Sequence, residues 1–353
     1  MVTYLESAKE VNKPWLETIL DTGVSSLSVT ENTAFNSSVA HLEIEYEDKS
    51  QELPKRILLK VNTEHDGQNE IQFYRFANGI DLPMIPRRLG MNYDIESGLS
   101  FLLLEDLSET HISPVNRERL KTLNGVPLQT HLDSIVDAIA EFHAAFWENP
   151  SFGKIPDTTE MRWWYRDENF HAKHVERRTG EWGKFKAMHH AHEVPLEWID
   201  LGESALAALP KLFESQIKPR LGSRRSLTMS QGDCYLTQFL VPRMALGRSY
   251  LIDFQDACVN FPAYDLVYMF ASFWTREQRT QYEEPYLRRY LSGLQSKGIR
   301  FDWSSLCDDY RLCLCYMLFD AVWNAVAGSS KEYWLPKMTC LISAYQDWDC
   351  ANL

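Results

Sequence analysis

The sequence predicts an α+β fold with two lobes: a small antiparallel β lobe over residues 1–107 and a larger, mainly helical lobe over residues 108–353. Two patterns support this prediction. Apolar and polar side chains alternate through several segments before residue 107, as they do in half-buried strands. After residue 107, apolar side chains mostly recur at the spacing of one buried helix face. Strand character returns only briefly, within residues 226–268.

The composition is that of a folded globular protein. Hydrophobic residues make up 44% and charged residues 24% of the 353 positions, which excludes a disordered or low-complexity chain. The 36 basic and 49 acidic residues leave a net charge of −13, so nucleic acids and anionic membrane surfaces are unsuitable partners. Seven scattered cysteines form no C-x-x-C pair, and we therefore expect neither a zinc site nor disulfides.

We expect no targeting or membrane segment. The N-terminal residues lack a basic start followed by an apolar core, as a secretory signal would have. The longest apolar run, Leu312 to Phe319, is far shorter than the ~20 residues that span a bilayer. A reducing, cytoplasmic location fits these features and the unpaired cysteines best.

The β lobe is predicted to hold about five strands and one helix. A short amphipathic helix ends near residue 21, and a polar loop over residues 31–38 joins the first two strands. The strands are expected over residues 26–30, 39–46, 56–61, 85–91 and 99–104, and the helix over residues 69–76.

The helical lobe contains one strongly patterned helix, expected over residues 131–148, whose apolar side chains form one stripe. The segment 160–200 is rich in Trp, His and charge and shows no clear period. Two strands, over residues 237–241 and 250–254, would form a hairpin. Helices resume from residue 265, with breaks near Gly298 and Gly328.

The hairpin carries the most informative polar residues. Asp233 follows a glycine that permits a tight turn, Gln238 comes five residues later where the chain enters a strand, and Asp253 follows the next apolar strand. If the strands pair, these three side chains converge at one end of the hairpin. Two carboxylates and an amide carbonyl are hard oxygen donors of the kind that Mg²⁺ accepts. A carboxylate in such a place can also accept a proton from an attacking hydroxyl.

This pattern resembles the signature of the aminoglycoside phosphotransferase and choline/ecdysteroid-kinase-like superfamily, whose members are relatives of protein kinases. That signature is H-G-D-x-x-x-x-N, followed about twenty residues later by a strand that ends in I-D-F or I-D-W. Asp233 aligns with the catalytic aspartate, Gln238 with the metal-binding asparagine and Asp253 with the metal-binding aspartate. The run Phe261–Leu266 resembles the P-x-x-D-L segment of the family. The resemblance covers nearly the whole chain and implies a protein-kinase-like fold.

The resemblance also assigns roles in the β lobe. Lys60 resembles the nucleotide-contacting lysine and Glu70 its partner on the helix. Residues 103–107 look like the hinge, where the backbone of Glu105 and Leu107 would pair with adenine. In the loop 31–38, the remaining candidates for phosphate contacts are Asn36, Ser37 and Ser38.

The sequence departs from the family pattern at three places. Gln231 stands where the family has histidine, and Gln238 stands where it has asparagine. The loop 31–38 contains no glycine. The first position usually supports the loop, but the second belongs to the metal site, where glutamine offers the same carbonyl on a longer side chain.

The resemblance implies a kinase that uses ATP (or GTP) with Mg²⁺ in the cleft between the lobes and phosphorylates a hydroxyl of a small molecule. The net charge favours a cationic acceptor, such as an amino-sugar, a choline-like compound or an amino-alcohol, and the tryptophans leave a hydrophobic alcohol open. Two alternatives remain: a pseudokinase that binds nucleotide or ligand without turnover, and an enzyme that uses the cleft for another reaction.

Several other polar residues are better explained by structure than by chemistry. His143 lies on an apolar helix face, which favours a buried, hydrogen-bonded histidine over a base, and Asp265 is expected to fix a loop. The aromatic run 163–165 could form a cage for an organic cation or simply pack on the helical lobe. For five clustered histidines we favour a solvated helical face over a metal site; they are His171, His174, His189, His190 and His192.

Overall fold

The computed structural model describes residues 3–33, 37–48, 50, 52–63, 67–152, 167–244 and 247–353, without the side chains of Thr33 and residues 189–193. The chain forms two compact units. The N-terminal unit comprises Met1–Ile112 and Leu240–Ala257, and the helical unit comprises Ser113–Phe239 and Cys258–Leu353. These units differ from a simple division at residue 107, because the segment that carries Asp253 belongs to the N-terminal unit.

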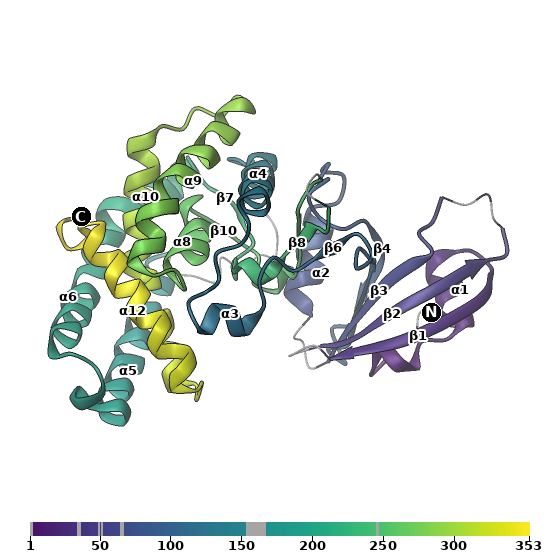
Figure 1. Ribbon diagram of the computed structural model, residues 1–353, viewed down its shortest axis with the longest axis horizontal. Helices are drawn as coiled ribbons and strands as arrows, with labels where there is room; N and C mark the ends of the chain where they lie inside the picture. Colours follow the sequence, from purple (N-terminus) through teal and green to yellow (C-terminus); the bar gives the residue numbers. More distant parts are fainter. Residues whose placement is uncertain are drawn as a thin grey trace. The chain divides into compact units, whose positions relative to one another are not determined.

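A five-stranded antiparallel sheet forms the body of the N-terminal unit, in the order β1-β2-β3-β5-β4 (Figure 1). The five predicted strands are confirmed, with shifts in their limits. Residues 31–33 continue the first strand and are not part of the loop, and the fourth strand begins three residues later than expected, at Arg88. The strands are β1 (Val24–Thr33), β2 (Ser38–Tyr46), β3 (Arg56–Asn62), β4 (Arg88–Tyr93) and β5 (Ser100–Glu105).

The core of this unit lies where the sheet meets the N-terminal helices η1 (Ala8–Glu10) and α1 (Lys13–Leu20). Asn12 caps the N-terminus of helix α1: its side chain accepts the N–H of Trp15 at 3.1 Å and so satisfies one of the free donors of the first turn. The Trp15 ring then packs edge-on against Phe101 of β5, with ring centroids 4.9 Å apart.

The N-terminal unit also contains a further helix and a second sheet, besides the 3₁₀ turn η4 (Phe254–Asp256). Helix α2 (Gln68–Phe76) follows β3, and a small sheet has the order β6-β8-β9, with β6 at His111–Ile112, β8 at Phe239–Pro242 and β9 at Tyr250–Leu251. The predicted hairpin is therefore present as β8 and β9. Its first strand starts later than expected, because Leu236–Gln238 forms the 3₁₀ turn η3 of the helical unit. Its second strand ends at Leu251, two residues before Asp253.

The helical unit consists of helices around the short antiparallel ribbon of β7 (Thr228–Ser230) and β10 (Cys258–Asn260). The predicted helix 131–148 is α4, and the breaks near Gly298 and Gly328 are confirmed as left-handed residues after two helices. The helices are α3 (Arg117–Lys121), α4 (Gln129–Ala145), α5 (Glu168–Glu193), α6 (Leu196–Leu212), the π-helical turn η2 (Phe213–Ile217), α7 (Lys218–Ser223), α8 (Ala263–Ala271), α9 (Arg276–Ser296), α10 (Trp303–Met317), α11 (Asp320–Val326), α12 (Lys331–Asp347) and the terminal turn η5 (Cys350–Asn352).

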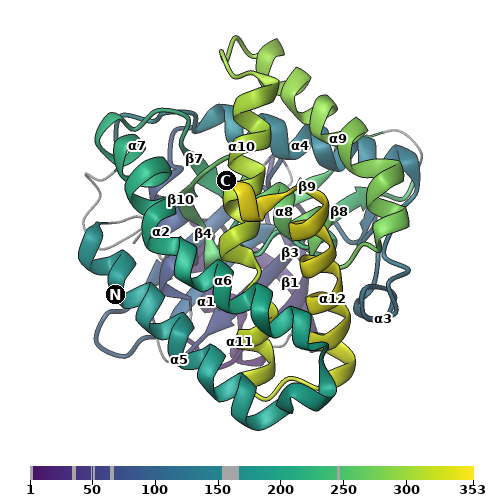
Figure 2. The same cartoon turned by 90° about the vertical axis from the view of Figure 1, so that its left-hand side faces the viewer.

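Helix α5 corrects the interpretation of the histidine cluster. Figure 2 shows α5 beside α6 and α11, and its inner face is buried against the rest of the unit. His171 and His174 are only 4% and 6% exposed, so the prediction of a solvated face is wrong for these two residues. His171 stacks on Phe213 at 4.2 Å and bonds the Tyr316 hydroxyl at 2.9 Å. The other three histidine side chains and the aromatic run 163–165 lie outside the described residues.

No helix among the described residues is long and apolar enough to cross a membrane.

Candidate active site

Lys60, Glu70 and Asp253 form a charged cluster in the N-terminal unit. Lys60 lies on β3, in register with Val39 of β2 and Leu102 of β5. Its Nζ atom is 2.8 Å from Glu70 Oε2 and 2.9 Å from Asp253 Oδ1. One ammonium thus bridges two carboxylates, which leaves the cluster with a net charge of −1.

Burial differs sharply within this cluster. The side chains of Lys60 and Glu70 are 13% and 3% exposed, whereas that of Asp253 is 36% exposed. Burial disfavours the charged form of Lys60, but the nearby carboxylates of Glu70 and Asp253 outweigh it and raise the pKa of Lys60. Lys60 therefore remains an ammonium ion, and Asp253 is the member of the cluster that reaches solvent and could bind a ligand.

The chain after Asp253 is fixed to helix α2 by several contacts. The Phe254 ring stacks on Phe73 at 4.1 Å, and the Phe254 N–H donates to Glu70 Oε1 at 3.1 Å. The Asn69 side-chain amide donates to the carbonyls of Gln255 and Ala257 at 2.6 and 3.1 Å. These contacts hold Glu70 and Asp253 on either side of Lys60.

The backbone of Asp253 is left-handed, with φ 62°. A residue with a Cβ adopts this conformation at a cost, although aspartate tolerates it better than most because its short side chain bonds locally. Such conformations persist where the surroundings fix them, as the contacts with α2 do here. The strand pattern in the sequence predicted that Asp253 follows an apolar strand, but not this reversal of the backbone.

Asp233 and Gln238 form a second cluster, in the helical unit. The Tyr235 N–H bonds the Asp233 carbonyl at 2.7 Å, and the Gln238 N–H bonds the Tyr235 carbonyl at 2.9 Å. This tight turn brings the two side chains together, and Gln238 Nε2 lies 3.1 Å from Asp233 Oδ2. A carboxylate can only accept, so the amide nitrogen of Gln238 faces Asp233 and its carbonyl oxygen remains the group that could contact a metal ion.

Gln231 supports the loop in the place where the family has histidine. Its side-chain oxygen accepts the Asp233 N–H at 2.9 Å, and the intervening Gly232 has φ 91°, a left-handed conformation that suits glycine. Gln231 therefore provides a side-chain acceptor for the backbone N–H of Asp233.

Asp265, which is fully buried, also binds the backbone of the loop that precedes Asp233. Its carboxylate accepts the N–H groups of Gln231 and Gly232 at 2.7 and 3.1 Å. His143 Nε2 is 3.1 Å from the same carboxylate, and His143 Nδ1 is 2.7 Å from the Tyr290 hydroxyl. The predicted structural roles of Asp265 and His143 are confirmed. The contribution of Tyr290 was missed, because nothing in its own helix pattern marks it.

The predicted hinge residues lie at the end of β5 and in the turn after it. The Glu105 N–H bonds the Arg87 carbonyl at 2.8 Å, and the Leu107 carbonyl accepts the N–H groups of Thr110 and His111 at 3.0 and 2.9 Å. Leu107 is buried. Contact of either backbone with adenine stays a prediction.

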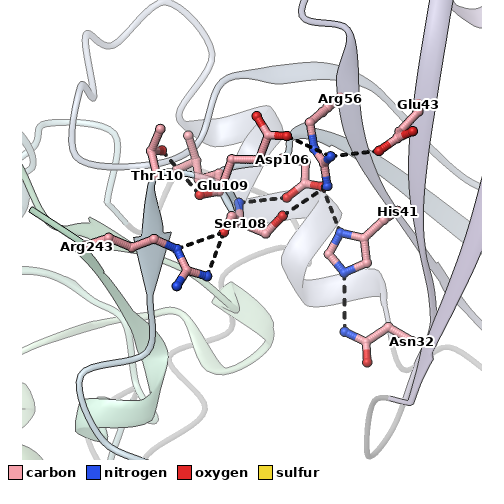
Figure 3. Close-up of polar contacts among 10 residues, drawn as sticks. Asn32, His41, Glu43, Arg56, Asp106, Ser108, Glu109, Thr110 and Arg243 are labelled. Atoms are coloured by element: carbon pink, nitrogen blue, oxygen red, sulfur yellow. Dashed lines mark hydrogen bonds and ion pairs between the residues drawn. The ribbon is translucent and has the colours of Figure 1, made fainter.

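Asp106, between the two hinge residues, organises a polar network that is shown in Figure 3. Its carboxylate accepts from His41 Nδ1 at 2.8 Å and from the Ser108 N–H at 2.9 Å, and it lies 3.5 Å from Arg56. Burial opposes its charge, but the Ser108 and His41 hydrogen bonds outweigh burial and lower the pKa of Asp106. Arg243, from the hairpin, bonds the Ser108 carbonyl at 3.0 Å. The network therefore ties the segment after β5 to the sheet and to the hairpin.

The loop between β1 and β2 is described in part. Asn36 lies outside the described residues, and a phosphate contact by Ser37 stays a prediction. Ser38 is bound within the fold: its Oγ is 3.0 Å from Ser7 Oγ and accepts the Ala8 N–H at 2.9 Å. A phosphate contact by Ser38 would require its hydroxyl to exchange these partners.

The donor chemistry of Asp253 and Gln238 fits magnesium, which binds oxygen and keeps several water or phosphate ligands beside one or two protein groups. Within the described part of the chain, no group of three or more His, Cys, Asp or Glu side chains is placed to hold a metal ion. Because Asp253 and Gln238 belong to different units, their predicted convergence on one metal stays a prediction.

Comparison with known structures gives matches over nearly the full chain. A putative aminoglycoside phosphotransferase from Ralstonia eutropha shares 14% identity over 96% of this chain and 97% of its own, with a TM-score of 0.60. Choline kinase from Cryptosporidium parvum shares 12% identity over 98% and 92%, with a TM-score of 0.57. Plasmodium vivax ethanolamine kinase shares 13% over 92% and 83%, with a TM-score of 0.52. No curated protein matches the sequence.

These structural similarities confirm the predicted α+β, protein-kinase-like fold. A model of one protein family matches residues 47–306, which include both charged clusters and most of the chain. The chain belongs to the phosphotransferase enzyme family.

Proposed function

We propose that this protein is a small-molecule kinase that transfers the γ-phosphate of ATP (or GTP) to a hydroxyl group. The bridging of Glu70 and Asp253 by Lys60 is the observation that carries the proposal. A buried lysine held as an ammonium beside a solvent-accessible carboxylate offers the charges that a metal–nucleotide complex needs. Family membership supports phosphotransfer but leaves the nucleotide and the acceptor open.

Each residue has a defined task in this proposal. Lys60, oriented by Glu70, neutralises phosphate charge. Asp233 orients the acceptor hydroxyl and accepts its proton while the hydroxyl oxygen bonds to the γ-phosphorus. The bond from that phosphorus to the bridging oxygen breaks, and the electron pair leaves with the nucleoside diphosphate. Asp253 and Gln238 would hold magnesium, which would neutralise charge on the phosphates.

The reaction gains mainly from positioning and electrostatics, because little covalent chemistry is left to the protein. The hydrogen bond from Gln238 to Asp233 favours this function over a pseudokinase. Although Gln238 replaces the asparagine of the family pattern, it restrains the carboxylate of Asp233 and keeps an amide oxygen for metal contact.

The test combines turnover with a separate measurement of nucleotide binding. The protein is incubated with Mg²⁺-ATP or Mg²⁺-GTP and a panel of small alcohols, amino-alcohols and amino-sugars, and both nucleoside diphosphate and phosphorylated product are measured. We expect one or more acceptors to be phosphorylated and the activity to be lost in Asp233→Asn. Asp308→Asn, at an exposed position of α10, is the matched control and should keep full activity.

Binding of a fluorescent ATP analogue distinguishes the alternatives. Asp233→Asn should bind the analogue as the wild-type protein does, whereas Lys60→Met should bind it more weakly. Saturable binding without turnover across the whole panel would support a pseudokinase. Absence of nucleotide binding would contradict the kinase and favour either a protein that binds another ligand without turnover or an enzyme for another reaction.

A further inference from the structure

Lys337 on α12 joins three parts of the helical unit. Its side chain is fully buried, and its Nζ donates to the Asp320 carboxylate, to Asn324 Oδ1 at 3.0 Å and to the Tyr235 hydroxyl at 2.5 Å. Asp320 and Asn324 lie on α11, whereas Tyr235 lies in the turn that begins at Asp233. Three acceptors use the three donors of an ammonium group, and this one side chain therefore connects α12 and α11 to the proposed catalytic loop.

Stability alone does not explain this arrangement. A buried lysine must be paired, because burial disfavours its charge, and Asp320 supplies the pairing. A buried ion pair, however, adds little stability over apolar side chains of similar size. The pair instead gives the side chain a direction: α11 accepts two donors of Lys337, and the third is directed at the Tyr235 hydroxyl. Lys337 is thus oriented to hold Tyr235 at a fixed distance from α12.

Tyr235 is the central residue of the turn from Asp233 to Gln238, which we call the catalytic turn. Its N–H donates to the Asp233 carbonyl at 2.7 Å, and its carbonyl accepts the Gln238 N–H at 2.9 Å. These two backbone hydrogen bonds shape the turn, and both involve Tyr235. Its ring packs edge-on against Tyr268 of α8, with ring centroids 4.7 Å apart. A shift of the Tyr235 side chain would therefore move the backbone on which Asp233 and Gln238 depend.

Two buried charged side chains hold this part of the chain, one on each side of Asp233. Asp265 of α8 accepts the backbone N–H groups of the two residues directly before Asp233. Lys337 of α12 donates to the side chain of Tyr235, two residues after Asp233. The first contact fixes the backbone before Asp233, and the second restrains the backbone after it. The backbone of Asp233 therefore has a defined position between two anchors.

We propose that Lys337 is a positioning residue for phosphotransfer: its hydrogen bond to the Tyr235 hydroxyl holds the catalytic turn so that the Asp233 carboxylate keeps the geometry of the reaction. This inference rests on the proposed kinase function, and Lys337 acts in it through Tyr235. A small displacement of a catalytic group slows the chemical step far more than it weakens substrate binding. Loss of this hydrogen bond should therefore lower kcat and leave the KM for ATP nearly unchanged.

Tyr235→Phe tests this hydrogen bond directly, because it removes the hydroxyl and keeps the ring. We expect kcat to fall by about 10-fold and the KM for ATP to stay within about 2-fold of the wild-type value. Tyr268→Phe is the matched control. Its hydroxyl lies in the same cluster, 3.5 Å from Asp320 Oδ2, so this change removes a hydroxyl that faces α11 and not the catalytic turn. Tyr268→Phe should keep the kcat of the wild-type protein.

A second variant removes the same hydrogen bond from the side of Lys337. Lys337→Met alone would leave the Asp320 carboxylate buried without its cation, so it is combined with Asp320→Asn. The combination should lower kcat by about the same factor as Tyr235→Phe. Addition of Tyr235→Phe to it should cause no further fall, because both changes remove the same hydrogen bond. Urea denaturation of each variant shows whether it is folded under the assay conditions.

Amide hydrogen exchange supplies a readout that needs no turnover. The N–H groups of residue 235 and Gln238 donate the two hydrogen bonds that shape the catalytic turn, and a loosened turn exposes them by local opening. We expect both to exchange about 5-fold faster or more in Tyr235→Phe than in the wild-type protein, and at the wild-type rate in Tyr268→Phe. If no acceptor is phosphorylated, this comparison still decides whether the hydroxyl holds the turn, so failure of the kinase function is distinguishable.

Three results would overturn the proposal. Unchanged exchange or unchanged kcat in Tyr235→Phe would show that its hydroxyl does not position the turn. Equal effects of Tyr235→Phe and Tyr268→Phe would assign the change to packing of the aromatic rings. Fully additive losses of kcat on combining the variants would show that Lys337 affects the rate by another route. If Lys337→Met with Asp320→Asn does not fold, the exchange rates and kcat of Tyr235→Phe decide.

Discussion

His143 Nε2 lies 3.1 Å from the Asp265 carboxylate, and both side chains are fully buried in the helical unit. Asp265 in turn accepts the backbone N–H groups of Gln231 and Gly232, directly before Asp233. The position of the proposed catalytic loop therefore depends on a histidine that has no contact with the reacting groups.

The first prediction concerns this support. His143→Phe should keep the packing volume but remove one hydrogen-bond partner of Asp265 and leave the buried Tyr290 hydroxyl without its partner, which costs about 1–3 kcal/mol. We expect a lower free energy of unfolding in urea and a fall in kcat, with little change in KM for ATP. His131→Gln, at a partly exposed position of the same helix, is the control. A higher KM for ATP with unchanged kcat would contradict this role.

The second prediction separates charge from function in the N-terminal unit. Lys60→Met leaves two carboxylates facing each other, and loss of one partner of a buried ion pair costs about 3–5 kcal/mol. Lys60→Met with Glu70→Gln removes one of these carboxylate charges, so the double variant should be more stable than Lys60→Met. Its kinase activity should stay as low as that of the single variant. A double-mutant cycle measured by denaturation and by turnover tests both statements.

Recovery of activity in that double variant would contradict the proposal, because it would mean that Lys60 matters only as the partner of Glu70.

The third prediction addresses the substitution of glutamine for asparagine at position 238. Gln238→Ala should remove the Gln238 hydrogen bond from the Asp233 carboxylate and an oxygen from the proposed metal site. We expect kcat to fall by about 10–100-fold and the Mg²⁺ concentration at half-maximal rate to rise. Gln238→Glu is the matched variant, because it keeps the size but repels Asp233. The role in metal binding fails if both variants keep the Mg²⁺ dependence of the wild-type protein.

Much of the fold and of the proposed site could be predicted from the sequence, for identifiable reasons. Alternation of side chains placed Lys60 on a strand, and helical spacing placed His143 on a buried face. Burial of His171 could not be foreseen, because Phe213 and Tyr316, which cover it, lie far along the chain. The left-handed backbone of Asp253 depends likewise on contacts with α2, and these are not encoded in the local pattern around Asp253.

The last prediction follows from the buried face of α5. Burial lowers the pKa of His174 to about 2, and the nearby Arg178 and Arg177 add to this effect. Burial also lowers the pKa of His171, to about 4, against the opposing charge of Glu214. In the unfolded chain both histidines titrate near pH 6.5. As the pH falls below 6.5, the unfolded state therefore binds protons that the folded state does not.

The free energy of unfolding should therefore decrease as the pH falls from about 6.5 to 4, by at most about 1.4 kcal/mol per pH unit for each histidine. His174→Leu removes one of the two titrating groups, and the Nε2 atom that it deletes is buried without a hydrogen-bond partner. We expect this variant to lose less stability than the wild-type protein over that range. The check is urea denaturation of both proteins at several pH values between 7 and 4. Parallel pH profiles would show that His174 is not the source of the acid sensitivity.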